Sequence, residues 1–523
     1  MPDVRTATRY ATNGLVCSVD HLASSAGVAA MQAGGNAVDA AIATSAVLAV
    51  TTQHMCGMGG DLFALVQRRG GPPFALCAAG RAGSGASSAA LRADGHATVP
   101  LVGDVRAVTV PGCVDGWAAL HERGARLDLA TLLAPAVALA RDGFPASPLL
   151  ARAIPAIAEL PGADDYRHPA GVRAGDRIRR PAVAAVLEAI GTGGRDAFYG
   201  GPFGSGLISV GGGLFAAADL AVSQADWVEP LGLRAWGHQV WTVPPPSQGY
   251  LSLAGAWIAD GLPLPDRPDD PAWPHLLVEA ARWASHDRPA VLFDGADGVA
   301  LLAPDDLQRR RTAIDPDRRT SPPGLSAGGG TIYLCTADGE GGAVSLIQSN
   351  AAGWGCHVVV PGTGIFLHDR GLGFSLEPGH PAELAPGRRP PHTLAPALVT
   401  HDDGRLAHVV GTMGGDMQPQ VVLQLLARLL RGGQSAGAAV SAPRWVLGTG
   451  GFTTWTGPGQ GHVSLEPGAP ASWADGLRAR GHEVIWLPAS ANVGHAHVIS
   501  ATADGVLGGA ADPRALTGSA AGF

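Results

Sequence analysis

The spacing of hydrophobic residues changes partway along the chain. In the first part, apolar positions recur mostly at helical spacing, which predicts helices over 22–32, 37–50, 129–143, 181–192 and 274–286. From residue 331 onward, short β-type runs recur at 331–337, 343–348, 357–360, 396–400, 406–411, 483–487 and 497–501. Two earlier runs, 14–19 and 238–243, are also β-type. A helix-rich first part and a strand-rich second part together predict sheets covered by helices.

The helix predicted over 37–50 is apolar on nearly every face, so we expect it to be buried. Asn36 precedes it, after two glycines, and can cap its first turn. The following loop, HMCGMGG (54–60), leads into a further strand. Its glycines permit positive φ or a close backbone approach. The sequence leaves open whether this loop is a plain turn or lines a pocket.

The segment 309–330 separates the two parts. It reads RRRTAIDPDRRTSPPGLSAGGG, has no hydrophobic period, and is dense in arginine, proline and glycine. Such a segment is typical of an exposed, flexible connection. We therefore expect a boundary at its end, with one unit spanning 1–330 and the other spanning 331–523.

Composition excludes several classes of function. The chain has 523 residues, of which 46% are hydrophobic and 15% charged, and its net charge is −8. No basic face of the kind that binds nucleic acid is present in the sequence. All 36 basic residues are arginine. The absence of lysine excludes the lysine of a phosphate-binding P-loop and the Schiff-base lysine of pyridoxal-phosphate enzymes.

The cysteines and the apolar runs bear on location. Six cysteines are scattered without a C-x-x-C pair, as expected of buried thiols rather than of a disulfide framework. The N-terminal stretch lacks the basic start and apolar core of a signal peptide. The most apolar run, 37–50, contains Asp39 and is too short to span a bilayer. We expect a cytoplasmic protein that does not associate with membranes.

Thr331 is the candidate nucleophile, because three glycines run directly into it and a strand is predicted after it. A threonine at the start of a chain can use its own α-amine, with a pKa of about 7.7–8.0, as the general base for its hydroxyl. Inside a chain that amine is blocked. We hypothesise that the chain cuts itself before Thr331, by attack of the hydroxyl on the carbonyl of Gly330. The alternative interpretation is a threonine that only begins a strand.

Two other motifs could carry chemistry. GLSAG (324–328) has the spacing of a nucleophile elbow around Ser326. That motif needs a strand before it and a helix after it, whereas here prolines precede it and glycines follow. His495 and His497 share one face of a predicted strand without a third ligand, which favours polar core or pocket lining over a metal site.

A series of stretches resembles the γ-glutamyltranspeptidase family of N-terminal-nucleophile hydrolases. They occur in the family's order and lie on both sides of residue 330. They are GLVCSVDHLASSAG (14–27), AGGNAVDAAIA (33–43), GMGGDLF (57–63), AVTVPGCVDGW (107–117), GRDAFYGG (194–201), PPPSQGY (244–250), VSLIQSNAAGWG (344–355), VVPGTGI (359–365), RPPHTLAPALV (389–399), GTMGGDMQPQ (411–420) and GAADPR (509–514).

The resemblance implies an α+β fold, a four-layer αββα sandwich, built from one cleaved chain with a large subunit (1–330) and a small subunit (331–523). It implies that Thr331 is the nucleophile and that Ser349 contacts it. The backbone N–H groups of Gly414 and Gly415 would form the oxyanion hole. Arg81 would bind a substrate carboxylate with its planar fork.

The resemblance also implies how substrates are recognised. Asn350 matches the asparagine beside the partner of the nucleophile. His392 and Thr393 replace the family's serine pair that contacts the substrate α-carboxylate. In the run HDRGLGFS (368–375), Gly373 stands where an aspartate would hold the substrate α-amino group. We therefore expect weaker binding of a γ-glutamyl ammonium group.

The expected function is that of an autoprocessed amidohydrolase or transferase that cleaves γ-glutamyl amides such as glutathione through an acyl-enzyme. Two alternatives stay open. One is an acylase for carboxylated amides of the glutaryl type, and the other is an unprocessed, non-catalytic relative that binds a small carboxylate. No cofactor is expected. The expected partners are a small amide substrate with a carboxylate and the two subunits of the cleaved chain, with a homo-oligomer of that pair left open.

Overall fold

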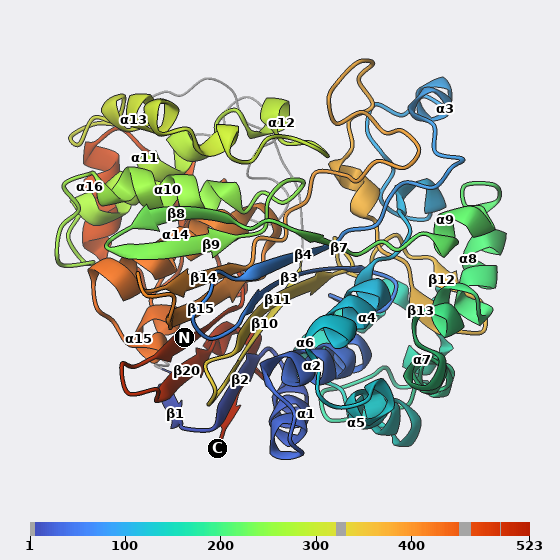
Figure 1. The fold of residues 1–523 in the computed structure, drawn as a ribbon. Coiled ribbons are helices and arrows are strands. Elements are labelled where there is room, and N and C mark those ends of the chain that lie inside the picture. The colour runs from blue at the N-terminus through green and yellow to red at the C-terminus, as the bar shows by residue number, and fades with distance from the viewer. Residues whose placement is uncertain (1–5, 321–330, 449–461, 492) are drawn as a thin grey trace.

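Two seven-stranded antiparallel sheets form the centre of the protein in a computed structural model that describes residues 6–320, 331–448, 462–491 and 493–523 (Figure 1). The first sheet has the order β1 (Arg9–Ala11), β20 (Leu507–Ala511), β19 (Ala496–Ala501), β15 (Leu406–Thr412), β14 (Ala397–Thr400), β9 (His238–Thr242) and β8 (Leu231–Ala235). The second has the order β21 (Ser519–Gly522), β2 (Gly14–Ser18), β10 (Ile332–Asp338), β11 (Ala343–Ser349), β3 (Asp61–Gln67), β4 (Phe74–Ala78) and β7 (Asp226–Val228).

Helices cover the outer face of each sheet, and Figure 1 shows the two groups on opposite sides of the molecule. The second sheet packs against α1 (His21–Gln32), α2 (Ala37–Thr51) and α4 (Cys113–Gly124). Outside these, α5 (Leu129–Asp142) packs on α2, and α7 (Pro181–Tyr199) packs on α4 and α5. The first sheet packs against α10 (Tyr250–Asp260), α14 (Gln418–Leu426) and α15 (Ala436–Ser441). Outside these, α11 (Ala272–Ser285) packs on α10 and α14, and α16 (Ala471–Ala479) packs on α11.

Shorter elements lie at the margins of the two helical layers. The helices are α3 (Ser88–Ala93), α6 (Pro148–Ala153), α8 (Pro202–Gly211), α9 (Ala217–Ala221), α12 (Arg288–Val291) and α13 (Pro304–Thr312). The strands are β5 (Phe144–Pro145), β6 (Arg177–Ile178), β12 (Val359–Val360), β13 (Ile365–Phe366), β16 (Trp445–Leu447), β17 (His462–Leu465) and β18 (Glu483–Trp486).

A separate apolar core fills the space between the two sheets. Leu15, Phe63 and Tyr333 enter it from the second sheet, and Leu398 and Val409 enter it from the first. Because side chains alternate along a strand, the intervening residues of each strand face the helices instead. The four layers are therefore helix, sheet, sheet and helix, which confirms the predicted αββα sandwich.

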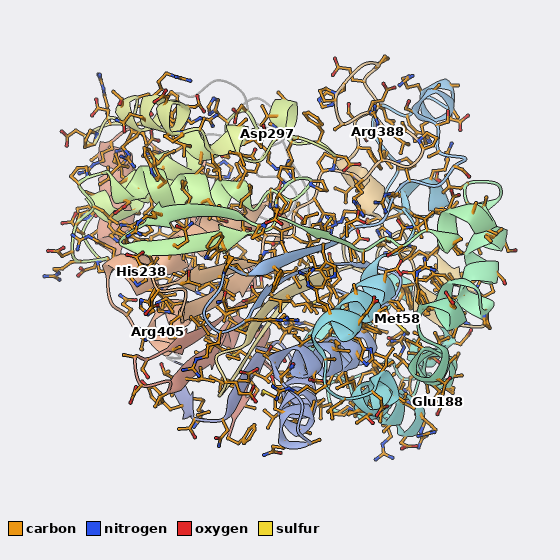
Figure 2. The ribbon with its side chains drawn as sticks, in the orientation of Figure 1. Met58, Glu188, His238, Asp297, Arg388 and Arg405 are labelled. Carbon is orange, nitrogen blue, oxygen red and sulfur yellow. The ribbon has the colours of Figure 1, made fainter. Side chains whose placement is uncertain are left out.

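Side chains fill the layers throughout (Figure 2). Met58 is buried in the helix-covered side of the second sheet, whereas Glu188 of α7 and Arg405 lie exposed at the surface. All six cysteines are buried and unpaired, as the sequence predicts. Within the described ranges, no helix is both long and apolar enough to cross a membrane.

The predicted helices and strands correspond closely to those observed, with one correction. Asn36 caps α2 by accepting hydrogen bonds from the N–H groups of Val38 and Asp39, and all of α2 is buried. The prediction that 309–330 is one irregular connection is wrong at its start, because residues 309–312 belong to α13. This helix is largely exposed and has no hydrophobic period, but aspartates in its first turn and arginines in its last favour it electrostatically.

The units 1–330 and 331–523 both contribute to each sheet. The first sheet combines β1, β8 and β9 from the first unit with β14, β15, β19 and β20 from the second. The second sheet combines β2, β3, β4 and β7 with β10, β11 and β21. A chain cut between the two units would therefore stay joined through the hydrogen bonds and cores of both sheets.

Candidate active site

Strand register places Thr331 beside Ser349. In the second sheet Ile332 pairs with Gln348, and Ser349 pairs with Asp61 on the next strand. Thr331, Ser349 and Asp61 thus lie in a row across β10, β11 and β3. Because Tyr333 faces the core between the sheets, Thr331, two residues earlier, faces the same way. The candidate nucleophile therefore lies at one end of the inter-sheet core.

Ser349 and Gln418 bond the hydroxyl of Thr331, a residue that is only 2% exposed. Its Oγ1 donates to Ser349 Oγ at 3.3 Å and accepts a hydrogen bond from Gln418 Nε2 at 3.2 Å. The predicted contact between Thr331 and Ser349 is therefore present. Gln418, on the first turn of α14, is a residue that sequence reasoning missed, although it lies within the quoted stretch GTMGGDMQPQ.

Arg370 is a second residue that sequence reasoning missed. It lies in the 3₁₀ turn Arg370–Gly373 and is fully buried. Its Nη2 donates to Ser349 Oγ at 3.0 Å and its Nη1 donates to Thr393 Oγ1 at 3.1 Å. Ser349 Oγ also accepts the backbone N–H of Ala351 at 2.8 Å. With these donors around it, Ser349 Oγ is a poor proton acceptor, so it orients Thr331 rather than deprotonating it.

A buried carboxylate, Asp61, balances the charge of Arg370. Asp61 Oδ2 lies 3.0 Å from His392 Nε2, 3.8 Å from Arg370 Nε and 3.9 Å from His368 Nδ1. Burial would raise the pKa of Asp61, but His368, His392 and Arg370 outweigh it and lower the pKa to about 2. Burial and Arg370 lower the pKa of His392 to about 3. At neutral pH the cluster therefore holds one carboxylate, one guanidinium and neutral imidazoles.

This cluster places the residues that were predicted to replace the serine pair. His392 bonds Asp61 and packs its ring against Phe63 at 4.6 Å between centroids. Thr393 contacts Arg370 directly. His392 therefore acts on Arg370 indirectly, through Asp61. Thr393 instead bonds the Arg370 guanidinium directly. Their roles in substrate binding stay predictions.

Asn350 and Asp369 form a polar pair next to Ser349. Asn350 Nδ2 donates to the carbonyl of Gln53 at 2.9 Å, and the N–H of Asp369 donates to the carbonyl of Asn350 at 3.2 Å. Asp369 Oδ1 accepts the N–H of Ala352 at 2.8 Å. Among the described residues, no hydrogen-bond partner reaches Asn350 Oδ1 or Asp369 Oδ2. Both oxygens belong to residues that adjoin Ser349 or Arg370 in sequence and can still accept hydrogen bonds.

The carboxyl of Asp369 makes stability depend on pH. Burial raises its pKa to about 7, and the Ala352 N–H and Arg370 offset this only in part. The folded chain thus holds the proton more tightly than the unfolded chain, so its free energy of unfolding falls as pH rises from about 4 to 7. An Asp369→Asn chain stays neutral and should gain stability over the parent across that range, by on the order of 1–4 kcal/mol at pH 7.5.

The test is to measure Tm between pH 4 and 8 for both chains in a Thr331→Ala background, so that both have the same covalent state. We expect the two Tm values to converge at about pH 4, to separate progressively between pH 4 and 7, and to keep a constant difference above pH 7. A difference that stays constant over the whole range would show that Asp369 does not titrate there.

Gly414 and Gly415 form a tight turn directly before α14. Their φ values are +130° and +61°, which side chains other than hydrogen rarely adopt. Gln248 donates from Nε2 to the carbonyls of Gly415 and Thr393 at 3.0 and 3.1 Å, so it links this turn to the segment beside Arg370. Because Gln418 bonds Thr331, the turn lies close to the nucleophile. Its role as an oxyanion hole stays a prediction.

Glycines also bring the loop 57–60 against the site. A Cβ at Gly60 would lie 2.2 Å from the carbonyl oxygen of Ser349 and 2.9 Å from Asn350 Oδ1. A Cβ at Gly59 would lie 2.1 Å from the carbonyl oxygen of Phe366. The loop that the sequence left open is therefore a close-packed wall of the site.

Arg81 lies at the margin of the site. The N–H of the preceding Gly80 donates to Asp61 Oδ1 at 3.1 Å, which places this loop beside the buried cluster. The Arg81 side chain is 27% exposed and bonds Asp226 at 2.7 Å and the carbonyl of Ser223 at 3.0 Å. Arg389 shares Asp226 at 2.7 Å. For Arg81 to bind a substrate carboxylate as predicted, its guanidinium must leave Asp226 or bind both carboxylates at once.

The structure describes one of the two alternative motifs. Ser326 of GLSAG lies outside the described residues. His495 and His497 are buried, and Tyr333 stacks on the His497 ring, which agrees with polar core. Within the part of the chain that the structure describes, no group of three or more His, Cys, Asp or Glu side chains could hold a metal ion.

This arrangement suits nucleophilic acyl transfer. The threonine hydroxyl accepts a hydrogen bond from Gln418 and donates one to Ser349. A buried glycine turn precedes Gln418, and the buried guanidinium of Arg370 bonds Ser349. Such a site can attack a carbonyl, stabilise the oxyanion that forms, and bind an anionic group of the substrate.

Comparisons with known proteins agree with this chemistry. Residues 23–522 match the family described as gamma-glutamyltranspeptidase. The chain is 38% identical to the oxamate amidohydrolase proenzyme of Klebsiella pneumoniae, over 99% of this chain and 100% of that protein. It is 33% identical to the glutathione hydrolase-like YwrD proenzyme of Bacillus subtilis, over 96% of this chain and 97% of that protein.

A solved structure supports the same assignment. The crystal structure of cephalosporin acylase from Bacillus halodurans superimposes with a TM-score of 0.91 at 34% identity, over 99% of this chain and 97% of that chain. Since the family match spans almost the whole sequence and the relatives are aligned nearly end to end, the protein is an enzyme of amide hydrolysis or transfer and belongs to the gamma-glutamyltranspeptidase family.

Proposed function

We propose that the protein cuts itself between Gly330 and Thr331 and then hydrolyses short amides whose acyl group carries a carboxylate next to the amide carbonyl, with oxamate as the type substrate. The observation that carries this proposal is the buried guanidinium of Arg370, which bonds the same Ser349 hydroxyl as the nucleophile. The oxamate amidohydrolase relative supports the same substrate class.

Self-cleavage would use the hydroxyl of Thr331 on the preceding peptide bond. The bond from Oγ1 to the carbonyl carbon of Gly330 forms, the C–N bond breaks, and the hydroxyl proton passes to the released nitrogen. Water then hydrolyses the ester and leaves Thr331 with a free α-amine. The proenzyme names of the two sequence relatives support this step.

Turnover would repeat the same bond changes on a substrate. The α-amine of Thr331 takes the hydroxyl proton as Oγ1 attacks the amide carbonyl, and the N–H groups of Gly414 and Gly415 stabilise the oxyanion. The amine returns the proton to the leaving nitrogen, which departs as ammonia. Water, deprotonated by the same amine, then hydrolyses the acyl-threonine ester.

The distances favour a short acyl group. The attacked carbon must come within about 3–3.5 Å of Oγ1. Arg370 Nη2 lies 3.0 Å from Ser349 Oγ, which is 3.3 Å from Thr331 Oγ1. A carboxylate bonded directly to the attacked carbon falls within reach of this guanidinium. Arginine has five N–H groups, and the bonds to Ser349 and Thr393 use two of them, so the fork can also bind a carboxylate.

A second candidate is a longer carboxylated acyl group of the glutaryl or γ-glutamyl type. The partly exposed pair of Arg81 and Arg389 around Asp226 favours it, because a longer chain would carry its carboxylate away from Arg370 toward this margin. The glutathione hydrolase-like and cephalosporin acylase relatives support the longer class. The γ-glutamyl group differs from the glutaryl group in carrying a free α-ammonium group.

The substrate panel that separates these candidates is oxamate, glutaryl anilide and γ-glutamyl anilide. We expect kcat/KM for oxamate, measured by ammonia release, to exceed that of either anilide by roughly 100-fold or more, equivalent to about 3 kcal/mol of transition-state binding. Faster turnover of glutaryl anilide would replace the oxalyl class with the longer one, and faster turnover of γ-glutamyl anilide would restore the glutathione-like function.

A further inference from the structure

Gln418 is fully buried at the start of α14, three residues after Gly415. Its Nε2 donates to Thr331 Oγ1 at 3.2 Å, and its Oε1 accepts the backbone N–H of Ala395 at 3.0 Å. The bond from Ala395 determines which side-chain atom is the oxygen and which is the nitrogen. A backbone N–H can only donate, so the amide oxygen faces Ala395 and the NH₂ group faces Thr331.

This orientation orders the hydroxyl of the nucleophile. Because Gln418 can only donate to Oγ1, one lone pair of that oxygen is used and its own proton points to Ser349 Oγ at 3.3 Å. Ser349 Oγ accepts from Arg370 and Ala351 as well. When Oγ1 loses its proton, the N–H of Gln418 is therefore already aimed at the oxygen on which negative charge develops.

We infer that Gln418 is a further catalytic residue, whose amide N–H stabilises Thr331 Oγ1 as it becomes a nucleophile in both self-cleavage and turnover. The inference rests on the proposed function. Gln418 exchanges no proton: in both reactions the Oγ1–C bond forms, the C–N bond breaks, and the hydroxyl proton passes to the released nitrogen. A preorganised donor at this position lowers the barrier without cost at the moment of reaction.

The position of Gln418 also links the nucleophile to the glycine turn. Gln418 begins the helix that directly follows Gly414–Met417, and Gln248 holds the carbonyl of Gly415 from the other side. A shift of this turn would thus move the donor at Oγ1 and the two glycine N–H groups together. The fold couples the orientation of the nucleophile to that of the oxyanion donors.

Two substitutions test the inference. Gln418→Met keeps the length of the side chain and removes the donor, so self-cleavage in freshly translated protein and acylation per titrated active site should each slow roughly 10- to 100-fold. Gln418→Glu places a carboxylate beside the α-ammonium of mature Thr331. The carboxylate should raise the pKa of this α-ammonium group. The rise of kcat/KM for oxamate on the acid side of its pH profile (the acid limb) should therefore move to higher pH by about one unit.

Gln424→Met is the matched control. Gln424 is a buried glutamine on the same helix, but it bonds the backbone of Trp445 at 2.9 and 3.1 Å instead of the nucleophile. We expect this variant to lose thermal stability yet to cleave itself and acylate within about threefold of the parent, with an unchanged acid limb. A role of Gln418 that is only structural would give the same result for both positions.

The outcomes separate the two proposals. Self-cleavage and acylation at the parental rate in Gln418→Met would overturn the catalytic role of Gln418, as would an unshifted acid limb in Gln418→Glu. Self-cleavage needs no added substrate, so it tests Gln418 even if oxamate is not turned over. A parent that cleaves itself but ignores oxamate contradicts the substrate class and leaves the role of Gln418 decided by the cleavage rates.

Discussion

Replacing Thr331 with alanine is expected to leave the purified protein as one uncut chain of 523 residues without amidase activity. The hydroxyl is the group that attacks in both proposed reactions, and the α-amine that serves as base exists only after the cut. Loss of a catalytic nucleophile lowers kcat by on the order of 10⁶-fold. Mass spectrometry of the chain and ammonia release from oxamate measure the two effects.

Two variants make this result specific. Thr331→Ser keeps a hydroxyl and should still cut itself, more slowly. Thr336→Val is the matched control, because Thr336 is a buried threonine on the same strand whose Oγ1 bonds the carbonyl of Ala37. It should lose stability while retaining cleavage and activity. Cleavage at the parental site in Thr331→Ala would contradict the account.

Replacing Arg370 with lysine is expected to reduce preference for a carboxylated substrate. Lysine keeps the charge but loses the planar fork, so the loss of one desolvated, charge-assisted contact of about 2–4 kcal/mol predicts a roughly 30- to 1000-fold fall in kcat/KM for oxamate. Oxamide has the same shape with an amide in place of the carboxylate, so its turnover should change by less than about tenfold. The ratio of the two rates is the measurement.

Arg180→Lys is the matched control for this experiment. Arg180 is also fully buried, but it bonds the carbonyls of Ala49 and Gly364 away from the nucleophile. It should lower stability and leave the oxamate-to-oxamide ratio unchanged. An Arg370→Lys enzyme with the parental ratio would show that another cation, with Arg81 as the first candidate, binds the substrate carboxylate.

The sequence predicts the nucleophile and its neighbour because local signals define them. The β-type runs at 331–337 and 343–348 become β10 and β11, and their short connection makes them antiparallel neighbours. Thr331 and Ser349 then meet through register alone. The burial of α2 and its cap at Asn36 follow in the same way from residues that are close in sequence.

The remaining parts of the site depend on contacts between distant segments. Arg370 lies in a short turn after β13, outside the regular strands. Its counter-ion Asp61 is more than 300 residues away in sequence. Arg81 likewise meets Asp226 from another element. Single-sequence patterns report the residue types of such segments but not which of them come together.

The segment before Thr331 shows a different limit. Residues 309–312 carry no hydrophobic period, because α13 buries only Leu307 fully, and an exposed helix without an apolar stripe resembles a linker in sequence. The charges at its two ends were the available signal. The prediction of a cut before Thr331 does not depend on whether residues 309–312 are helical or irregular.

Intact-mass measurement of the purified wild-type protein, with sequencing of any new N-terminus, tests the central claim most directly. The account predicts two tightly associated chains, residues 1–330 and 331–523, the second beginning with Thr331. A single uncut chain after prolonged incubation, or a cut that leaves any residue other than Thr331 at the new N-terminus, would contradict it.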